Sequence, residues 1–185
     1  MQKQLCILLL FCSFHINAQF GKNCEITQLK INLINPGIEY ERGLGVNTTL
    51  DIKAGLQIAL DPALEEPLEE VDLFPALALQ YRYYYNFERR GRNGRQIYGN
   101  SANYVAPATA VFYPGSRTVA NAEIRGIIAY GGLVTGLQRS YNSGFNFSVD
   151  VGAAYHVGPF KGSMLPVANL SIGWIISEKR WCVGK

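Results

Sequence analysis

Apolar and polar residues alternate along the whole of the stretch 145–157. Its odd positions are all apolar, and its even positions are all polar or small; the apolar members are Phe145, Phe147, Val149, Val151, Ala153, Tyr155 and Val157. A period of two indicates one extended strand with two chemically opposite faces. Most strands have about 5–6 residues, whereas a tilted membrane-spanning strand needs about 9–11. The stretch therefore predicts a membrane-spanning β-strand.

The same alternation recurs in six further stretches, namely 35–41, 48–60, 74–88, 103–113, 122–138 and 167–176. Because bacterial single-chain barrels have an even number of strands, we expect an eighth strand, in the region 23–30 or 158–165. After Gln19 no apolar run reaches the about 18 residues that a transmembrane helix requires. Strands satisfy their backbone groups in lipid only in a closed sheet. The predicted fold is all-β, a closed antiparallel up-and-down transmembrane β-barrel of about eight strands.

The first 18 residues have the features of a secretory signal peptide. Lys3 provides a positive start, Leu5 to Phe14 form a short apolar segment, and Ala18 is a small residue at the expected cleavage site. We therefore expect a signal peptide over 1–18 and one outer-membrane β-barrel domain over 19–185. The expected location is the cell outer membrane, which the protein reaches by export.

Alternation by itself leaves open which face of the barrel is inside, since a soluble barrel such as a lipocalin turns its apolar face inward. Two features favour the membrane version. The polar faces carry strand glycines, which suit the lumen of a narrow barrel; they are Gly37, Gly55, Gly152 and Gly173. The apolar faces end in aromatic residues, at Tyr40, at Tyr81 to Phe87 and at Phe145, as interfacial girdles would.

Two stretches alternate less clearly, and there the more apolar set of residues is expected to face outward. In 103–113 this set is Tyr104, Ala106, Ala108, Ala110 and Phe112. In 122–138 it is Ile124, Ile128, Tyr130 and Val134, with Glu123 and Arg125 opposite.

With the polar faces inside, the predicted lumen holds an ionisable network composed of Glu39, Glu41, Asp51, Lys53, Arg82, Glu88, Glu123, Arg125, Asp150 and His156. Charges in a narrow lumen must pair, because an unpaired buried charge costs several kcal/mol. This predicts a salt-bridged plug. The excess of acids over bases leaves a cation channel as the alternative.

The most concentrated charge feature is the set of arginines Arg89, Arg90, Arg92 and Arg95. Lipopolysaccharide phosphates are the natural anions for arginines at an outer rim, and a plain solvated loop is the alternative. Binding of nucleic acid also uses stacking aromatics, but a membrane girdle uses the nearby tyrosines better, so no nucleic-acid partner is expected. With a periplasmic N-terminus the third readable strand, 74–88, runs outward, which predicts that the arginine segment lies outside and the acidic connection 61–72 inside.

Cys24 and Cys182 remain after removal of the signal and lie near the two ends of the chain. An even strand count brings both ends to one rim, and the periplasm is oxidising. A disulfide is therefore possible, and two free thiols are the alternative because sequence does not show the geometry.

Little in the sequence indicates catalysis. His156 is the one histidine after the signal, and it shares a strand face with Ser148 and Asp150. At about 3.3 Å per residue, Asp150 lies roughly 20 Å from His156 along the strand, too far for a catalytic triad. No phosphate-binding loop or metal-spaced cluster occurs. We expect no enzyme activity, no cofactor and no metal.

Three short motifs resemble those of the small uncharacterised outer-membrane β-barrel proteins of Bacteroidetes. They are Tyr81-Arg-Tyr-Tyr-Tyr-Asn86, Asn100-Ser-Ala-Asn-Tyr104 and Gly136-Leu-Gln-Arg139. The resemblance implies a barrel architecture similar to OmpA and OmpX, and brings no established activity. It departs at the end, where such barrels usually close on a terminal aromatic, but 177–185 follow the last predicted strand here.

These features predict a structural or surface-interaction role in the outer membrane. The expected partners are outer-membrane lipid and lipopolysaccharide, with an envelope protein as a further possibility, and the barrel is expected to be a monomer. A small channel or ligand carrier is one alternative, and a lipid-modifying enzyme is another.

Overall fold

The structure is a computed structural model, and it describes residues 24–58, 73–113, 116–119, 122–157 and 162–182. The predicted signal peptide and most of the acidic connection 61–72 lie outside the described residues. Among the described residues, no helix has both the length and the hydropathy to cross a membrane.

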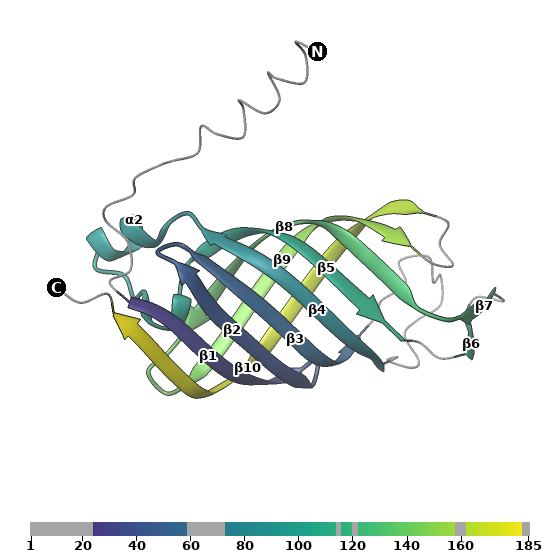
Figure 1. Cartoon of the computed structure of the whole chain (residues 1–185), viewed down its shortest axis with the longest axis horizontal. Helices are drawn as coiled ribbons and strands as arrows, with labels where there is room; N and C mark the ends of the chain where they lie inside the picture. Colours follow the sequence, from purple (N-terminus) through teal and green to yellow (C-terminus); the bar gives the residue numbers. More distant parts are fainter. Residues whose placement is uncertain (1–23, 59–72, 114–115, 120–121, 158–161, 183–185) are drawn as a thin grey trace, which may run out of the picture.

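Eight antiparallel strands form one sheet that closes on itself (Figure 1). In order of pairing around the ring they are β1 (Cys24–Ile34), β10 (Ser163–Cys182), β9 (Phe145–Val157), β8 (Ile128–Ser140), β5 (Asn103–Phe112), β4 (Leu73–Tyr84), β3 (Thr48–Ile58) and β2 (Gly37–Gly45), which pairs with β1 again. Apart from the β5–β8 connection, each strand pairs with the next one in the chain, so the prediction of an all-β, up-and-down antiparallel sheet is confirmed.

The eighth strand is β1, one of the two places predicted for it. It contains the region 23–30 except its first residue and continues to Ile34, where a two-residue turn, Asn35-Pro36, leads into β2. Asn35 has a positive φ of 58°, a conformation that asparagine tolerates better than most residues. The region 158–165 contributes only the beginning of β10.

Two strands end at clearly different residues from those predicted. The strand predicted over 74–88 ends at Tyr84, and a short helix α2 (Phe87–Arg92) and a 3-10 turn η1 (Tyr98–Asn100) follow it. Residues 177–182, predicted to follow the last strand, belong to β10, whose final residues pair with β1. β10 continues beyond the alternating stretch 167–176 because its last residues pair with β1.

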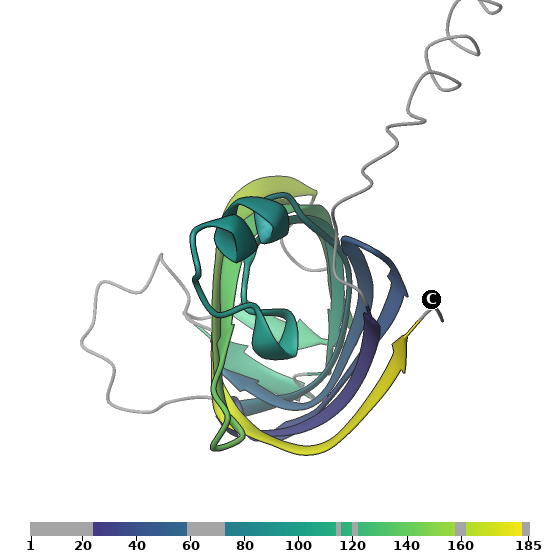
Figure 2. The ribbon, with the colours of Figure 1, turned by 90° about the vertical axis from the view of Figure 1, so that its left-hand side faces the viewer.

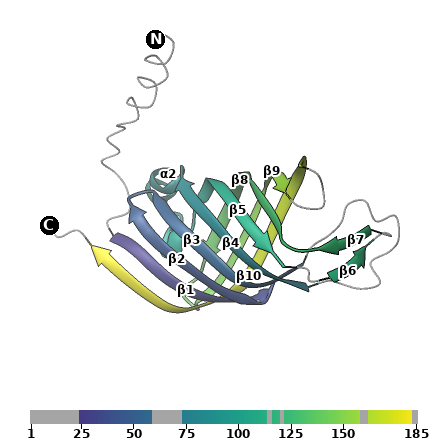
Figure 3. The same ribbon diagram turned by 45° about the vertical axis from the view of Figure 1, so that its right-hand side comes forward.

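The stretch 122–138 is not one strand. Residues Ala122–Arg125 form β7, which pairs with β6 (Ser116–Val119) in a separate two-stranded hairpin. Gly126 then adopts a positive φ of 97° before β8 begins. Figure 3 shows that hairpin at the end of the molecule opposite α2.

Most strands of the ring turn apolar side chains outward and polar ones inward, as predicted. On β9, Asn146, Ser148 and Asp150 are buried, whereas Val151 is 51% exposed. On β4, Leu77 is 55% exposed while Arg82 is fully buried. The same division holds for β3 and β10. On these strands the buried charged side chains are inside the ring, and the large aliphatic ones are outside it.

On β5 and β8 the predicted faces are inverted. The residues expected outside are inside; among them Tyr104, Ala106, Ala110, Tyr130 and Val134 are all buried. The outward positions carry other apolar residues, with Leu133 69% exposed and Val111 41% exposed. Both faces of these strands are apolar or small, so hydrophobicity did not distinguish them. The ring decides instead, because a narrow lumen accepts alanine on its inner face more easily than valine or leucine.

Tight packing between β8 and β9 depends on inward glycines. A Cβ added to Gly152 would clash with the carbonyl oxygen of Leu133, and one added to Gly132 would clash with the backbone of Ala153 and Ala154. These are backbone atoms, which cannot move aside as a flexible side chain would. The inner-face glycines therefore permit the close approach of neighbouring strands.

The first and last strands meet at the rim that carries α2. The backbone register of β1 and β10 places Cys24 directly opposite Cys182. The side chains of both cysteines lie outside what the structure describes, so the disulfide stays a prediction. We call this end of the ring the seam rim.

Candidate functional site: a buried network of charges

Glu41 is the hub of a polar network in the half of the lumen nearer the seam rim. It is fully buried on β2 and accepts hydrogen bonds from four side chains on four different segments. Tyr84 Oη (2.8 Å) and Asn100 Nδ2 (2.6 Å) donate to Oε1; Lys30 Nζ (2.8 Å) and Gln138 Nε2 (2.9 Å) donate to Oε2. The carboxylate thereby joins three strands to the connection that carries η1.

Lys30 of β1 connects Glu41 to a second carboxylate. Its ammonium group donates to Glu39 Oε1 at 2.7 Å as well as to Glu41, and also to Gln138 Oε1 at 3.2 Å. The other oxygen of Glu39 accepts from Asn32 at 3.1 Å and lies 3.5 Å from the ammonium of Lys53. All three donors of Lys30 are thus used inside the ring.

Arg82 of β4 occupies the centre of the network. Its guanidinium pairs with Asp51 Oδ2 at 2.8 Å, donates to Gln80 Oε1 at 2.8 Å, and donates to Gln138 Oε1 at 2.9 Å. The ring of Tyr104 lies 4.7 Å from its central carbon, in cation–π contact. In this cluster Glu39, Glu41 and Asp51 face three cations, Lys30, Lys53 and Arg82.

Asp150 of β9 is held by neutral donors instead of a cation. Asn169 donates to one carboxylate oxygen at 2.7 Å, and Tyr104 and Gln80 donate to the other at 3.0 and 3.3 Å. Hydrogen bonds from neutral donors satisfy a buried carboxylate. Asp150 therefore needs no further counter-charge, and the ionic cluster beside it is balanced without it.

The connection between β4 and β5 covers the lumen at the seam rim. Gly99, in η1, accepts hydrogen bonds on its carbonyl from Gln138 (3.0 Å) and Ser140 (2.7 Å). Viewed from this rim, α2 and η1 lie across the opening of the ring (Figure 2). Phe87 of α2 is buried with its ring centroid 4.9 Å from that of Tyr84. Polar bonds and an aromatic contact together fix the cover.

β10 holds the same cover from the side. The guanidinium of Arg180 lies 5.1 Å from the ring centroid of Tyr98 in η1. Burial raises the pKa of Tyr98, and the neighbouring Glu178 carboxylate raises it further. Tyr98 is therefore a neutral phenol beside a paired Arg180 and Glu178.

The lumen half farther from the seam rim is built differently. Its inner face carries small and aromatic residues, with Ala78, Ala110, Tyr130 and Ala154 forming a buried cluster against Phe112. The space at the boundary with the polar half, beside Lys53 and Asn169, is a cavity of about 20 Å³. That volume is sufficient for about one water molecule, so no ligand-sized chamber lies there.

The three carboxylates of the cluster lie close together, as the ligands of a metal ion would. Oxygens of Glu39, Glu41 and Asp51 lie within 4.8 Å of one another. However, Lys30 and Arg82 already occupy the space between them with their own charges. These ion pairs already neutralise the three carboxylates, so the carboxylates do not fit a metal ion as ligands.

The structure brings together most of the ionisable residues predicted for the lumen. Glu39, Glu41, Asp51, Arg82 and Asp150 are buried inside the ring, and the side chain of Lys53 is only 12% exposed. His156 is on the inner face of β9 near its far end, with its ring centroid 5.3 Å from that of Tyr130.

Three predicted members of the network are elsewhere. Glu88 is in α2, where it pairs with Arg92 at the surface. Glu123 and Arg125 belong to β7 of the separate hairpin, so the prediction that places them in the lumen is wrong. The strand predicted over 74–88 continues beyond the end of β4, and the strand predicted over 122–138 begins before the start of β8. Both predictions therefore assigned residues outside the ring to a strand of the ring. Phe87, predicted to face outward, is buried for the same reason.

Four central members of the network were missed: Lys30, Tyr84, Asn100 and Gln138. A signal for Lys30 was present, because Gln28, Lys30 and Asn32 alternate with apolar residues along β1. The other three occur within or beside the motifs that carry the resemblance described above. Tyr84 was on the predicted inward face with Arg82 but carries no formal charge, Gln138 lies on β8, whose faces were inverted, and Asn100 enters the lumen from η1, which is not a strand.

The residues considered for catalysis do not assemble into a triad. Asp150 is bonded to Asn169, Tyr104 and Gln80, whereas His156 stacks on Tyr130 further along the same strand. The six-residue separation corresponds to roughly 20 Å along a strand. The described part of the chain therefore shows no Ser–His–Asp arrangement at this place.

The predicted arginine segment forms α2 and the turn after it. Arg92 pairs with Glu88 at 3.2 Å, and Arg90 donates to the carbonyl of Gln96 at 2.9 Å. The strand that leads into this segment, β4, is the fourth of the ring and not the third. The segment consequently shares a rim with the start of β1 and the end of β10, so the reasoning that placed it on the rim away from the N-terminus is wrong.

Comparison with known proteins adds no relative. No family model, no curated protein and no solved structure matches the chain. Any function therefore has to be argued from the geometry of the ring, its lumen and its outer surface.

Proposed function

We propose that the protein is an outer-membrane β-barrel with a structural or surface-interaction role, and that its lumen is sealed. The observation that carries the proposal is the distribution of side chains, with ion pairs inside and large aliphatic residues outside. Leu77, Leu133 and Val151 are each more than half exposed, and similar residues surround the ring. Apolar surfaces of this extent mark membrane or partner contacts. A lipid bilayer is the surrounding that stabilises such a surface on every side.

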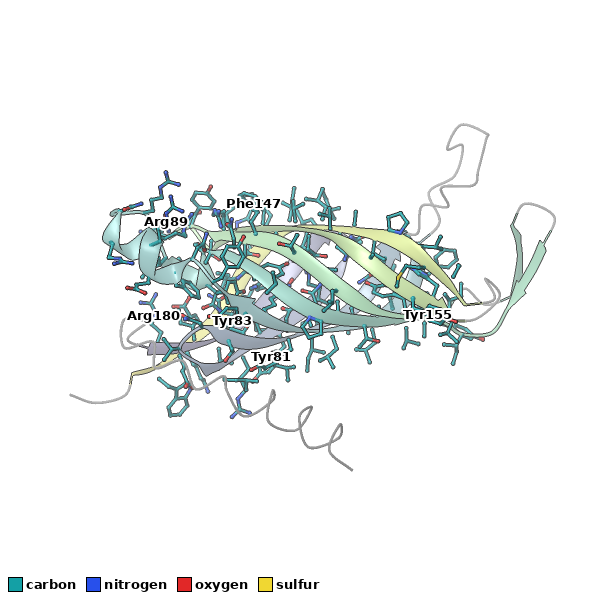
Figure 4. All side chains as sticks on the ribbon, turned by 90° about the horizontal axis from the view of Figure 1, so that it is seen from above. Tyr81, Tyr83, Arg89, Phe147, Tyr155 and Arg180 are labelled. Carbon is teal, nitrogen blue, oxygen red and sulfur yellow. The ribbon has the colours of Figure 1, made fainter. Side chains whose placement is uncertain are left out.

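The position of the aromatic residues supports a bilayer over a protein partner. Tyr81, Tyr83 and Phe147 point outward near the seam rim, and Tyr155 points outward near the far rim (Figure 4). Aromatic girdles at two levels, with aliphatic residues between them, are typical of transmembrane barrels. The distance between the levels is then set by the apolar layer of the membrane.

The export signal expected over 1–18 and the resemblance to small outer-membrane barrels of Bacteroidetes support the same location. Both are inferences from sequence, and they make the outer membrane the relevant bilayer. The monomeric barrel would then contact lipid around its circumference, and its connections would be available to envelope partners.

A sealed lumen favours a structural or interaction role over transport. Six charged side chains, from Lys30 to Arg82, fill the section next to the seam rim, and the η1 connection lies over them. An ion would have to separate buried pairs to pass, at a cost of several kcal/mol for each charge left unpaired. We expect no conductance in planar bilayers, and steady single-channel currents would favour the channel alternative.

The membrane assignment is tested by charge substitution on the outer face. Leu79→Arg, on β4, should cost about 2–4 kcal/mol if Leu79 faces the middle of a bilayer. Ile97→Arg is the matched control, because Ile97 is similarly exposed but lies between α2 and η1, beyond the strands. The measurement is urea unfolding in liposomes, followed by heat-modifiable migration on gels. Equal, near-zero effects at both positions would show that the outer face meets water.

Fractionation supplies the independent test of location. The protein should be recovered with outer membranes and should resist extraction at high pH and high salt. Recovery in the soluble periplasmic fraction would contradict the proposal.

A further inference from the structure

We propose that the arginines of the seam rim bind the phosphate groups of anionic phospholipids in the inner, periplasmic leaflet of the outer membrane. This rests on the proposed function, and it changes the partner expected from sequence, which was lipopolysaccharide in the outer leaflet. The defined surface consists of Arg89, Arg90, Arg92, Arg95 and Arg139, and we call it the arginine rim.

Strand number determines which side of the membrane the arginine rim faces. Because the ring has eight strands, β1 starts and β10 ends at the same rim. A barrel that inserts from the periplasm keeps its chain ends on that side, since moving them across would carry the termini through the apolar layer. β4 runs toward this rim and delivers α2 to it. The arginine rim is therefore periplasmic.

The connections at the two rims are mixed in length. At the seam rim, Val46-Asn47 and the turn 141–144 are short, whereas the β4–β5 connection, which carries α2 and η1, is long and folds back over the lumen. At the far rim, Asn35-Pro36 is a two-residue turn, whereas β3 and β4 are joined by 59–72, and β5 and β8 by a segment that contains the hairpin β6–β7. Barrels of this type have short periplasmic turns and longer outer loops, so the orientation rests on the position of the chain ends and not on the length of the connections.

Three members of the arginine rim, Arg90, Arg95 and Arg139, lie close enough to repel one another. Arg139 lies at the end of β8, close enough to Arg90 and Arg95 for their positive charges to act on it. Its guanidinium is held in place by hydrogen bonds to Asn103 Oδ1 (2.7 Å) and the Gln138 carbonyl (2.7 Å). Burial, and next the charge of Arg95, lower the pKa of Arg90. A phosphate would relieve this repulsion.

The level of the cluster matches the headgroup region of a bilayer. Tyr85, 53% exposed, and Tyr141, 44% exposed, lie beside Arg139, and Tyr81 and Tyr83 precede them on β4. Tyrosine is enriched at the membrane–water interface. Figure 4 shows Arg89 beyond the level of Tyr81 and Tyr83, at the end of the ring. Guanidinium groups at this depth lie beside lipid phosphates, to which arginine binds in bidentate geometry.

Labelling of single cysteines tests the orientation. Asn93→Cys, beside α2, and Glu66→Cys, in the β3–β4 connection, are each placed in a Cys24→Ser, Cys182→Ser background. A membrane-impermeant maleimide should label Glu66→Cys on intact cells, and Asn93→Cys only after the outer membrane is permeabilised. Labelling of Asn93→Cys on intact cells would overturn the proposal and restore lipopolysaccharide as the partner. If the background does not fold, protease sites inserted at the same positions in the natural chain give the same readout.

Lipid binding is tested on the purified barrel in micelles that contain either phosphatidylglycerol or phosphatidylcholine. Native mass spectrometry should show selective retention of phosphatidylglycerol. The change Arg89→Gln with Arg95→Gln should weaken retention by about fivefold for each arginine. Arg42→Gln is the control, because Arg42 is an exposed arginine on β2, across the ring from β8. Equal retention of the two lipids, or selectivity that survives the double change, would overturn the proposal.

The outcomes separate this inference from the proposed function. If the protein is heat-modifiable and membrane-bound but Asn93→Cys is labelled on intact cells, the barrel assignment stands and the periplasmic position of the arginine rim is refuted. If the protein is recovered in the soluble fraction, the barrel assignment itself is refuted.

Discussion

The two halves of the lumen are filled by different kinds of side chain. Near the seam rim, Lys30, Glu39, Glu41, Asp51 and Arg82 fill the ring with buried ion pairs and hydrogen bonds. Farther along, alanines and glycines fill it with Tyr130 and Phe112. We call these the charged half and the small half.

The difference follows from the partners available to a buried polar group. In the charged half, the η1 connection lies close enough to donate from Asn100 and to accept at Gly99. Buried charges are tolerated where the structure supplies partners for them, as it does here for Lys30 and Glu41. The small half has no such folded-in segment among the described residues, and it is closed by contact between backbones. The charged half should therefore be sensitive to loss of a partner, and the small half to added volume.

The largest expected effect is loss of the hub carboxylate. Glu41→Ala removes the carboxylate to which Tyr84, Asn100 and Gln138 donate, and it leaves Lys30 with one carboxylate less. Breaking a buried pair in this way costs about 3–5 kcal/mol. Urea unfolding in liposomes measures it.

The matched control is Glu88→Ala, which breaks the exposed pair between α2 residues Glu88 and Arg92. An exposed pair contributes less than about 1 kcal/mol. Similar losses in the two variants would remove the distinction between buried and surface charge.

The next effect concerns the seam that closes the charged half. If Cys24 and Cys182 are bonded, reduction should lower the free energy of unfolding by about 2–4 kcal/mol. Mass spectrometry of non-reduced peptides should show the two terminal segments linked. A protein with Cys24→Ser and Cys182→Ser should be insensitive to the reductant. Two free thiols in protein isolated from the outer membrane would contradict the bond.

In the small half, an added methyl group should be enough to destabilise the fold. Gly152→Ala forces a Cβ against the backbone of Leu133 and Val134, and overpacking of this kind costs about 1–3 kcal/mol. Gly131→Ala is the control, because nothing lies within 4 Å of a Cβ added to this outward glycine of β8. The same unfolding assay should show little or no loss for Gly131→Ala, and equal losses would refute the role assigned to close strand approach.

The smallest effect is expected at the edge of the cover. Arg180→Gln removes the cation–π contact with Tyr98, which at an exposed site contributes about 0.5–1 kcal/mol. Hydrogen exchange of residues 98–102 should become faster, while exchange on β8 and β9 should not change. Unchanged exchange in η1 would show that Glu41 and Gln138 hold the cover without β10.

Strand positions followed from local alternation because one polar and one apolar face leave a period of two in the chain. The same contrast correctly indicated that Asp51, Arg82 and Asp150 are inside, since each is flanked by apolar neighbours that suit the outer surface. Where both faces are apolar or small, as on β5 and β8, alternation carried no such information, and the predicted direction was inverted.

Closure of the ring decided the remaining features. It required β1 beside β10, which makes β4 the fourth strand, so that the arginine segment shares a rim with the two chain ends; closure also turned Tyr104 and Tyr130 inward. It also brought Gln138 of β8 and Arg82 of β4 against Lys30 and Glu41 of β1 and β2, although Lys30 and Gln138 are 108 residues apart in the sequence. The physical reason is that these contacts depend on which strands become neighbours and on the width of the space they enclose, and neither quantity is expressed in any single stretch of residues.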